Sequence, residues 1–221
     1  MIKMKKLRII PLVLAVLLLC SCGKKETTQT SYNLEDMNYA SVNGEIITTE
    51  EIEYFKMRYR SDIINEYAEK YGVKDYSDFW DKDFDGATPN DTLEKRALDE
   101  AVKAKIKLVM MRENGVYDNI SFNALLVKAN KFNAENQNAD GVVGIKTVDI
   151  SGFYTYYIST GEMNLKNILA EGELKPTEEE MAAAAKANPE ATENGLISII
   201  VSEKYDKLIA EKIESANVTK F

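Results

Sequence analysis

Helix-start signals recur along this sequence of 221 residues, and each is followed by apolar residues at helical spacing. Such a start pairs an N-cap oxygen with a glutamate three residues later, so that each side chain satisfies a backbone amide of the other. Three pairs fit the pattern: Thr48 with Glu51, Asp91 with Glu94, and Thr177 with Glu180. Because the apolar residues that follow step by three or four, the sequence predicts a mostly α fold.

The helices expected from these signals and from their stops cover most of the sequence after residue 47. They lie at residues 48–72, 91–115, 121–132, 153–169, 177–188 and 205–216, with a loop at 133–147 and a separate apolar run at 196–201. The helix at 91–115 has two apolar stripes, one through Leu93 and Leu108 and another through Leu98 and Val109. A helix that is apolar on two sides packs between others, so we expect this one to be central.

Short strands are expected near both ends of the domain. Val42, Ile46 and Ile47 flank an Asn-Gly pair, which is a strong hairpin signal. Residues 217–221 alternate between polar and apolar side chains as a small strand does. The prediction is a helical domain with a short pair of terminal strands.

The first 21 residues resemble a bacterial lipoprotein signal. Four basic residues precede an apolar run at 9–19 that is too short to span a bilayer, and Leu19-Cys20-Ser21-Cys22 follows. Cys22 fits the lipidated position, since Leu19 lies three places before it and a small residue directly before it. The alternative is an ordinary secretory signal with two incidental cysteines. The expected organisation is a signal at 1–21, a lipid-anchored tether at 22–39 and a domain at 40–221.

Charge and cysteine content limit what the exported chain does. Removal of four positive charges with residues 1–21 leaves 24 basic and 36 acidic side chains, a net charge of −12. Nucleic-acid binding depends on basic side chains that neutralise phosphates, so nucleic acid is not an expected partner. The membrane contact is expected from the lipid, and no disulfide is expected within a chain whose remaining cysteine is acylated.

The sequence contains no histidine. This excludes Ser/His and Cys/His nucleophile pairs, histidine-ligated zinc and a proline isomerase site of the parvulin type, which uses histidines. No cofactor is expected.

Two segments resemble the N-terminal, chaperone domain of the SurA/PrsA family of extracytoplasmic foldases. The first is Ala-Ser-Val-Asn-Gly-Glu-Ile-Ile-Thr at residues 40–48, followed by helices; the second is the closing helix and strand at 205–218. The resemblance implies a helical peptide-binding module. Complete members insert a parvulin domain before the closing helix, whereas here only residues 188–201 separate the last two helices. Even if such a resemblance suggests the name of a peptidyl-prolyl isomerase, we expect no isomerase activity.

Aromatic side chains are the candidates for peptide contact, because they combine apolar area with a polar tip. Five are singled out: Phe79, Trp80, Tyr154, Tyr156 and Tyr157. Packing into the core is the competing interpretation for most of them, but Tyr156 lies off the apolar stripe of its helix.

The run Asp81-x-Asp83-x-Asp85-Gly86 copies the first half of a calcium-binding EF-hand loop. Its second half fails, because the twelfth position is Thr92 rather than glutamate. A solvated acidic loop is therefore the main interpretation, with calcium binding as the weaker one.

These features lead to a hypothesis of a membrane-anchored, extracytoplasmic chaperone that holds unfolded exported polypeptides. The alternative is a structural or assembly lipoprotein that binds one folded partner. An enzyme, either an isomerase without imidazole or a calcium-dependent hydrolase, is the third possibility. A solute receptor is disfavoured because such proteins alternate strands and helices.

Overall fold

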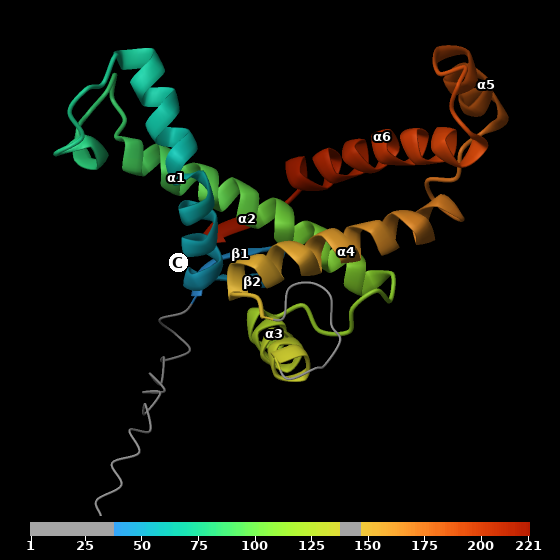
Figure 1. Cartoon of the computed structure of the whole chain (residues 1–221), viewed down its shortest axis with the longest axis horizontal. Helices are drawn as coiled ribbons and strands as arrows, with labels where there is room; N and C mark the ends of the chain where they lie inside the picture. The colour runs from blue at the N-terminus through green and yellow to red at the C-terminus, as the bar shows by residue number, and fades with distance from the viewer. Residues whose placement is uncertain (1–37, 138–146) are drawn as a thin grey trace, which may run out of the picture. The chain divides into compact units, whose positions relative to one another are not determined.

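Six α-helices and three short strands make up the part of the chain that the computed structural model describes, residues 38–137 and 147–221 (Figure 1). In chain order the elements are β1 (Asn38–Val42), β2 (Glu45–Thr48), α1 (Thr49–Tyr71), the 3-10 turn η1 (Phe79–Asp81), α2 (Pro89–Glu113), α3 (Phe122–Gln137), α4 (Ile150–Ala170), α5 (Glu178–Ala187), α6 (Glu193–Glu214) and β3 (Val218–Lys220). The predicted mostly α fold is confirmed. The expected signal, Cys22 and nearly all of the expected tether lie outside the described residues, and the domain boundaries stay predictions.

The sheet joins the two ends of the described chain. β1 and β2 form a hairpin whose turn residues, Asn43 and Gly44, have φ values of 52° and 87°, as a two-residue turn of this kind requires. The strand order is β2-β1-β3, and Val42 lies directly opposite Val218 in the antiparallel pairing of β1 with β3. The predicted hairpin and the predicted terminal strand pair are therefore both present.

The helix starts follow the capping signals, with one correction. Thr48 with Glu51 and Thr177 with Glu180 both form complete capping boxes. The expected start of α2 at Asp91 is wrong, since the N-cap is Thr88, and Asp91 is the third helical residue of its capping box. Pro89 occupies the first helical position, where the missing amide hydrogen is no loss, so the helix begins earlier than its acidic residues indicate.

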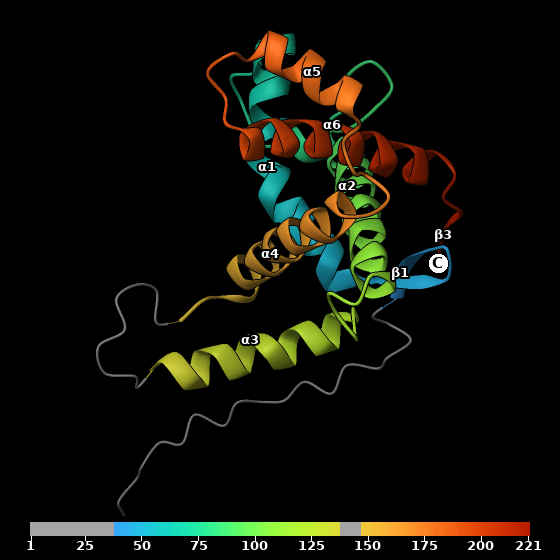
Figure 2. The same ribbon diagram turned by 90° about the vertical axis from the view of Figure 1, so that its right-hand side faces the viewer.

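α2 is the central helix, as predicted. It packs against α1, α4 and α6 (Figures 1 and 2). Its buried side chains belong to more than one face. It ends at Glu113, and Gly115 follows with a φ of 72°, the left-handed conformation expected for a glycine after a helix.

Two expected helix boundaries are wrong: the end of α3 and the start of α6. Residues 133–137 were expected in a loop, but α3 continues through Gln137. Residues 196–201 were expected as a separate apolar run, but they are the second and third turns of α6, which Thr192 caps. Leu196, Ile200 and Val201 are buried there, so tertiary packing holds the two segments as one helix.

Two apolar clusters stabilise the fold. The main one joins the sheet to α1, α2, α3, α4 and α6. The smaller one lies where the far half of α1 meets the start of α2 and η1, and its buried members are Ile63, Tyr67, Phe79 and Leu93.

Gly161 allows α4 to approach its neighbours closely. A Cβ atom at this position would lie 2.6 Å from Met111 Sδ and 2.6 Å from Tyr117 Cε2. The ring of Tyr117 has little room to move, because it stacks on Tyr157 at 4.0 Å and its hydroxyl donates to the Tyr157 carbonyl. The close approach of α4 to its neighbours therefore requires a glycine at this position.

Gly161→Ala is expected to lower the free energy of unfolding by about 1–3 kcal/mol, because the added methyl group overpacks the contact. Urea denaturation measures the change. Gly195→Ala is the matched control: its Cβ would make only ordinary contacts, with the nearest atom at 3.4 Å. The control gains helix propensity of up to about 1 kcal/mol, so two equally stabilised variants would contradict the packing requirement.

A surface cluster ties the terminal strand to α2. The Glu94 carboxylate accepts hydrogen bonds from Lys220 Nζ on β3 and from the Tyr39 hydroxyl on β1. The bond from Lys220 and then that from Tyr39 lower the pKa of Glu94.

Because the pKa of Glu94 is lowered in the folded protein, its stabilising effect is present above its unfolded-state pKa and is lost as the pH falls through the folded value. Glu94→Gln should therefore lose less stability than wild type between neutral pH and about pH 3, a range that crosses the ordinary glutamate pKa. Urea midpoints at the two pH values measure this. Glu173→Gln, at an exposed site, should keep the wild-type pH dependence; the same dependence in Glu94→Gln would contradict the assignment.

Candidate functional site

The candidate site is a pocket of about 640 Å³ between β2, α2 and the start of α3. Figure 2 shows the start of α3 next to the end of α2 and the sheet. The pocket mixes apolar and polar side chains, and its lining residues are Asn38, Gly44, Glu45, Ile46, Thr48, Lys105, Arg112, Asp118, Asn119, Ile120, Ser121, Phe122, Asn123 and Leu126. A pocket of this volume and mixed lining has the properties of a ligand site.

The pocket runs along the outer edge of β2. Glu45 reaches α2, where it accepts a hydrogen bond of 2.7 Å from Arg112. Ile46 is 37% exposed and, as the next residue of the strand, points to the opposite face of the sheet. Because side chains from both faces line the same pocket, the pocket follows the edge between them.

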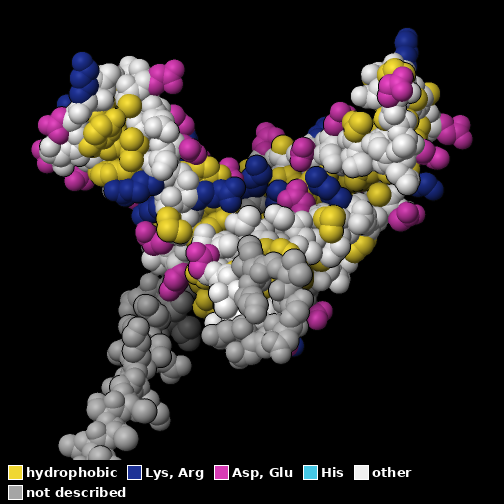
Figure 3. Space-filling view, in the orientation of Figure 1, with side chains coloured by type: hydrophobic (Ala, Val, Ile, Leu, Met, Phe, Trp, Pro, Cys, Tyr) yellow, Lys and Arg dark blue, Asp and Glu magenta, His cyan; other side chains and the backbone are white. Residues whose placement is uncertain are grey.

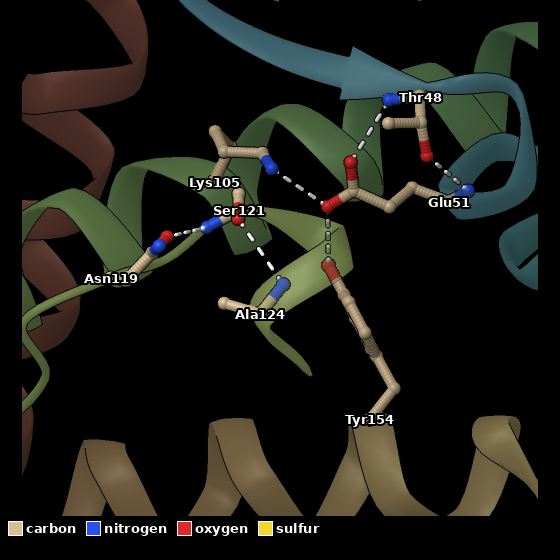
Figure 4. Close-up of polar contacts among 7 residues, drawn as sticks. All are labelled: Thr48, Glu51, Lys105, Asn119, Ser121, Ala124 and Tyr154. Carbon is tan, nitrogen blue, oxygen red and sulfur yellow. Dashed lines mark hydrogen bonds and ion pairs between the residues drawn. The ribbon is translucent and has the colours of Figure 1, made fainter. Parts of the chain in front are cut away.

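The buried carboxylate of Glu51 is bonded to Thr48 and Lys105, which both line the pocket (Figure 4). Glu51 Oε2 accepts the Thr48 amide at 2.9 Å, while Oε1 accepts Lys105 Nζ at 2.8 Å and the Tyr154 hydroxyl at 3.3 Å. These bonds come from β2, α2 and α4, and Glu51 itself belongs to α1. One carboxylate therefore joins four elements.

Glu51 and Lys105 form an ion pair that is shielded from water. The side chains of Glu51 and Lys105 are each 2% exposed. Burial and the neighbouring Glu51 charge raise the pKa of the Tyr154 hydroxyl well above its ordinary value, so Tyr154 stays a neutral hydrogen-bond donor. Removal of one partner from such a pair leaves an uncompensated buried charge.

The far wall of the pocket begins with a short turn that starts α3. Asn119 Oδ1 accepts the Ser121 amide at 2.9 Å, and Ser121 Oγ accepts the Ala124 amide at 3.2 Å (Figure 4). Ser121 thus caps α3, the helix expected at residues 121–132. It directs Phe122 inward, where it is buried, and leaves Asn123 exposed beside the pocket.

The hydroxyls and the lysine of the pocket lining already take part in hydrogen bonds within the fold. Its hydroxyls, Thr48 and Ser121, already accept the amides of their own helix starts. Its lysine is bonded to the buried carboxylate. No hydroxyl among the lining residues is hydrogen-bonded to a basic side chain, as a nucleophile–base pair would require.

The three predicted tyrosines of α4 lie outside this pocket. Tyr154 and Tyr157 are buried in the main apolar cluster, as the competing interpretation expects for a helical stripe. Burial raises the pKa of Tyr157 to about 12, and Lys128 Nζ donates to its hydroxyl at 3.0 Å. Tyr156 is 58% exposed, so it is the one of the three that a partner can reach. A role of these residues in peptide contact stays a prediction.

Phe79 and Trp80 lie in the smaller cluster, apart from the α4 tyrosines. Phe79 is buried against Tyr67, which supports packing onto α1, and the half-buried Trp80 has the Arg60 guanidinium 4.0 Å from its ring centre. Figure 3 shows hydrophobic side chains gathered over the loop after α1 on the face seen there. Peptide contact through Phe79 or Trp80 also stays a prediction.

The acidic loop forms a turn. Asp83 Oδ1 accepts the Gly86 amide at 3.0 Å, Asp85 has a φ of 58°, and Phe84 pairs with Ala87. Asp81, Asp83 and Asp85 are all exposed. Within residues 38–137 and 147–221, no three or more His, Cys, Asp and Glu side chains are grouped to hold a metal ion, so the weaker calcium interpretation gains no support.

Sequence reasoning missed both the pocket and the pair of Glu51 with Lys105. Glu51 was recognised only as a capping residue, and Lys105 falls among the apolar positions of the two-sided α2 stripe. A lysine at a predicted buried position was a usable signal, because a buried lysine requires an anionic partner.

Comparison with known proteins gives one relative. The chain is 26% identical over 169 residues to the chaperone for lacto-N-biosidase from Bifidobacterium longum subsp. longum, and the match covers 69% of this chain and 60% of that protein. No family model matches the chain, so the comparisons do not bear out the SurA/PrsA resemblance. No solved structure matches it either. In the described ranges, every helix is too short or too polar to cross a membrane.

Lys105→Met is expected to lower the free energy of unfolding by about 3–5 kcal/mol, since it leaves the Glu51 carboxylate buried and unpaired. Lys131→Met removes a lysine that is 74% exposed and should change stability by less than about 0.5 kcal/mol. Urea denaturation of both variants checks this. Equal losses in the two would contradict a stabilising role for the buried pair.

Proposed function

We propose that the protein is a membrane-anchored, extracytoplasmic chaperone that holds unfolded exported polypeptides without proline isomerase chemistry. The pocket beside β2 is the proposed binding site. Client segments would be held there through apolar contacts and hydrogen bonds, and no bond of the client would be made or broken.

The observation that carries this proposal is the lining of the pocket. It combines apolar surface from Ile46, Ile120, Phe122 and Leu126 with exposed amide groups such as those of Asn119 and Asn123. Unfolded polypeptides present both apolar side chains and unpaired backbone groups, so a mixed surface complements them. Burial of apolar client area at about 25 cal/mol per Å² would drive capture.

The named relative supports a chaperone role in general. That protein is a chaperone for lacto-N-biosidase, but this chain spans only 60% of its length, so a shared mode of action is part of the proposal. The absence of histidine from the sequence supports the exclusion of parvulin-type isomerase chemistry.

Membrane anchoring rests on the sequence. The basic start, the short apolar run and the Leu19-Cys20-Ser21-Cys22 segment support lipidation at Cys22. A lipid-anchored chaperone would meet exported chains next to the membrane that they have just crossed, while its acidic surface keeps bound complexes apart by charge repulsion.

The second candidate function is the binding of one specific partner protein. It is favoured by the name of the relative, which specifies a single protein, lacto-N-biosidase. On this alternative the chain is an assembly lipoprotein that binds one folded or folding protein through the same pocket.

The purified protein is expected to slow the aggregation of a chemically denatured model client at equimolar concentration, measured by light scattering. A charge-matched variant, Ile46→Asn with Leu126→Asn, should protect less, because it removes apolar lining from the pocket. Serum albumin at the same concentration is the control for crowding. Scattering as fast as in the control would refute a general chaperone.

Cross-linking in the native cell, followed by identification of the captured proteins, separates the two candidates. A broad set of exported proteins, lost in the pocket variant, supports the general chaperone. One stoichiometric protein supports the dedicated alternative.

A further inference from the structure

We propose that a client segment binds as an added β-strand on the free edge of β2, with a basic side chain next to Asp118. The inference rests on the proposed function and specifies its ligand: an extended polypeptide with alternating apolar residues and a lysine or arginine. Strand addition would satisfy backbone groups that the fold leaves open.

The backbone N–H and C=O of Ile46 point away from β1. On β1 the odd-numbered residues bond to the C-terminal strand and its flanks, because Asn43 donates to Asn217 and Tyr39 accepts from Phe221. The even-numbered residues therefore face β2, where Val42 pairs with Glu45 and Ala40 with Ile47. In an antiparallel ladder the residue between two hydrogen-bonded positions directs its N–H and C=O outward, and here that residue is Ile46.

The outer edge of β2 has unpaired backbone groups at Ile46, whereas its end at Thr48 is already bonded. The Thr48 amide is the next outward donor, and the Glu51 carboxylate already occupies it. The pocket of about 640 Å³ lies along the edge, with the first turn of α3 on its far side. An added strand would thus lie between β2 and α3 and bond mainly to Ile46.

The other edge of the sheet is protected. β3 has three residues, all exposed, and Lys220 lies at its end with its ammonium on Glu94. Short strands and lysines are the usual devices that prevent unwanted strand pairing. β2 carries no lysine and borders a partly apolar pocket.

The pocket lining carries an unpaired negative charge. Of the charged side chains that line the pocket, Glu45 pairs with Arg112 and Lys105 pairs with Glu51. Asp118 is exposed and forms no ion pair with any of the residues that the structure describes. The pocket thus presents one uncompensated negative charge, which is complementary to a lysine or arginine in the bound segment.

The test uses the full chain, purified in detergent, and a fluorescein-labelled peptide of alternating valine and serine with one lysine, followed by fluorescence anisotropy. Ile46→Pro removes the outward N–H, which an edge strand tolerates, and should weaken binding about fivefold, the equivalent of one lost hydrogen bond. Ile46→Val keeps that N–H and a β-branched side chain and should bind as wild type. Equal affinities of the two variants would overturn strand addition.

Backbone methylation of the peptide gives a readout that does not depend on folding of a variant. N-methyl groups on one alternating set of amides should weaken binding, while those on the other set should not, because only every second amide of an added strand faces its neighbour. Asp118→Asn should weaken the lysine peptide about two- to fivefold and leave a glutamine version unchanged. Uniform effects of methylation would refute strand pairing, and an unchanged affinity in Asp118→Asn would refute the charge assignment.

The outcomes also separate this inference from the proposed function. If Ile46→Pro protects a denatured client as well as wild type does and methylation shows no alternation, strand addition is wrong while the chaperone role stands. If wild type neither binds the peptide nor slows aggregation, both are wrong.

Discussion

The buried carboxylate of Glu51 is the contact on which the arrangement of the domain depends. It caps its own helix through the Thr48 amide and binds Lys105 of α2 and Tyr154 of α4. Apolar packing alone is non-directional and would leave several orientations of these helices close in energy. A buried charge has only one well-satisfied arrangement, so we infer that this contact selects the register in which α1, α2 and α4 meet beneath the sheet.

The same contact explains why a pocket remains beside β2. Thr48 ends the strand and begins α1, so α1 turns away from the sheet edge where the carboxylate holds it. α3 begins on the other side of the gap, at a turn fixed by Asn119 and Ser121. Local hydrogen bonds at the starts of α1 and α3 therefore fix the two segments that border this space.

Local signals predicted most of the fold, because capping pairs, the Asn-Gly turn and helical periodicity act over a few residues. The start of α2 was misplaced, since both Thr88 and Asp91 are good cap residues and only the structure shows their reciprocal bonds. The pocket could not be predicted in this way: its walls come from residues 38–48, 105–112 and 118–126, which the fold brings together. The aromatic residues singled out from the sequence are mostly core, because tyrosines at helical spacing face inward as readily as valines or leucines.

The pairing of β1 with β3 has a consequence for how the polypeptide acquires its structure. Asn43 and Asn217 are 174 positions apart, yet each bonds to the other. A ribosome makes Asn43 long before Asn217. One side of β1 therefore stays unpaired while the segments that form α1 to α6 are synthesised. β1 therefore completes its pairing only once the segment around residue 218 is available, and a delay in the release of that segment also delays completion of the sheet.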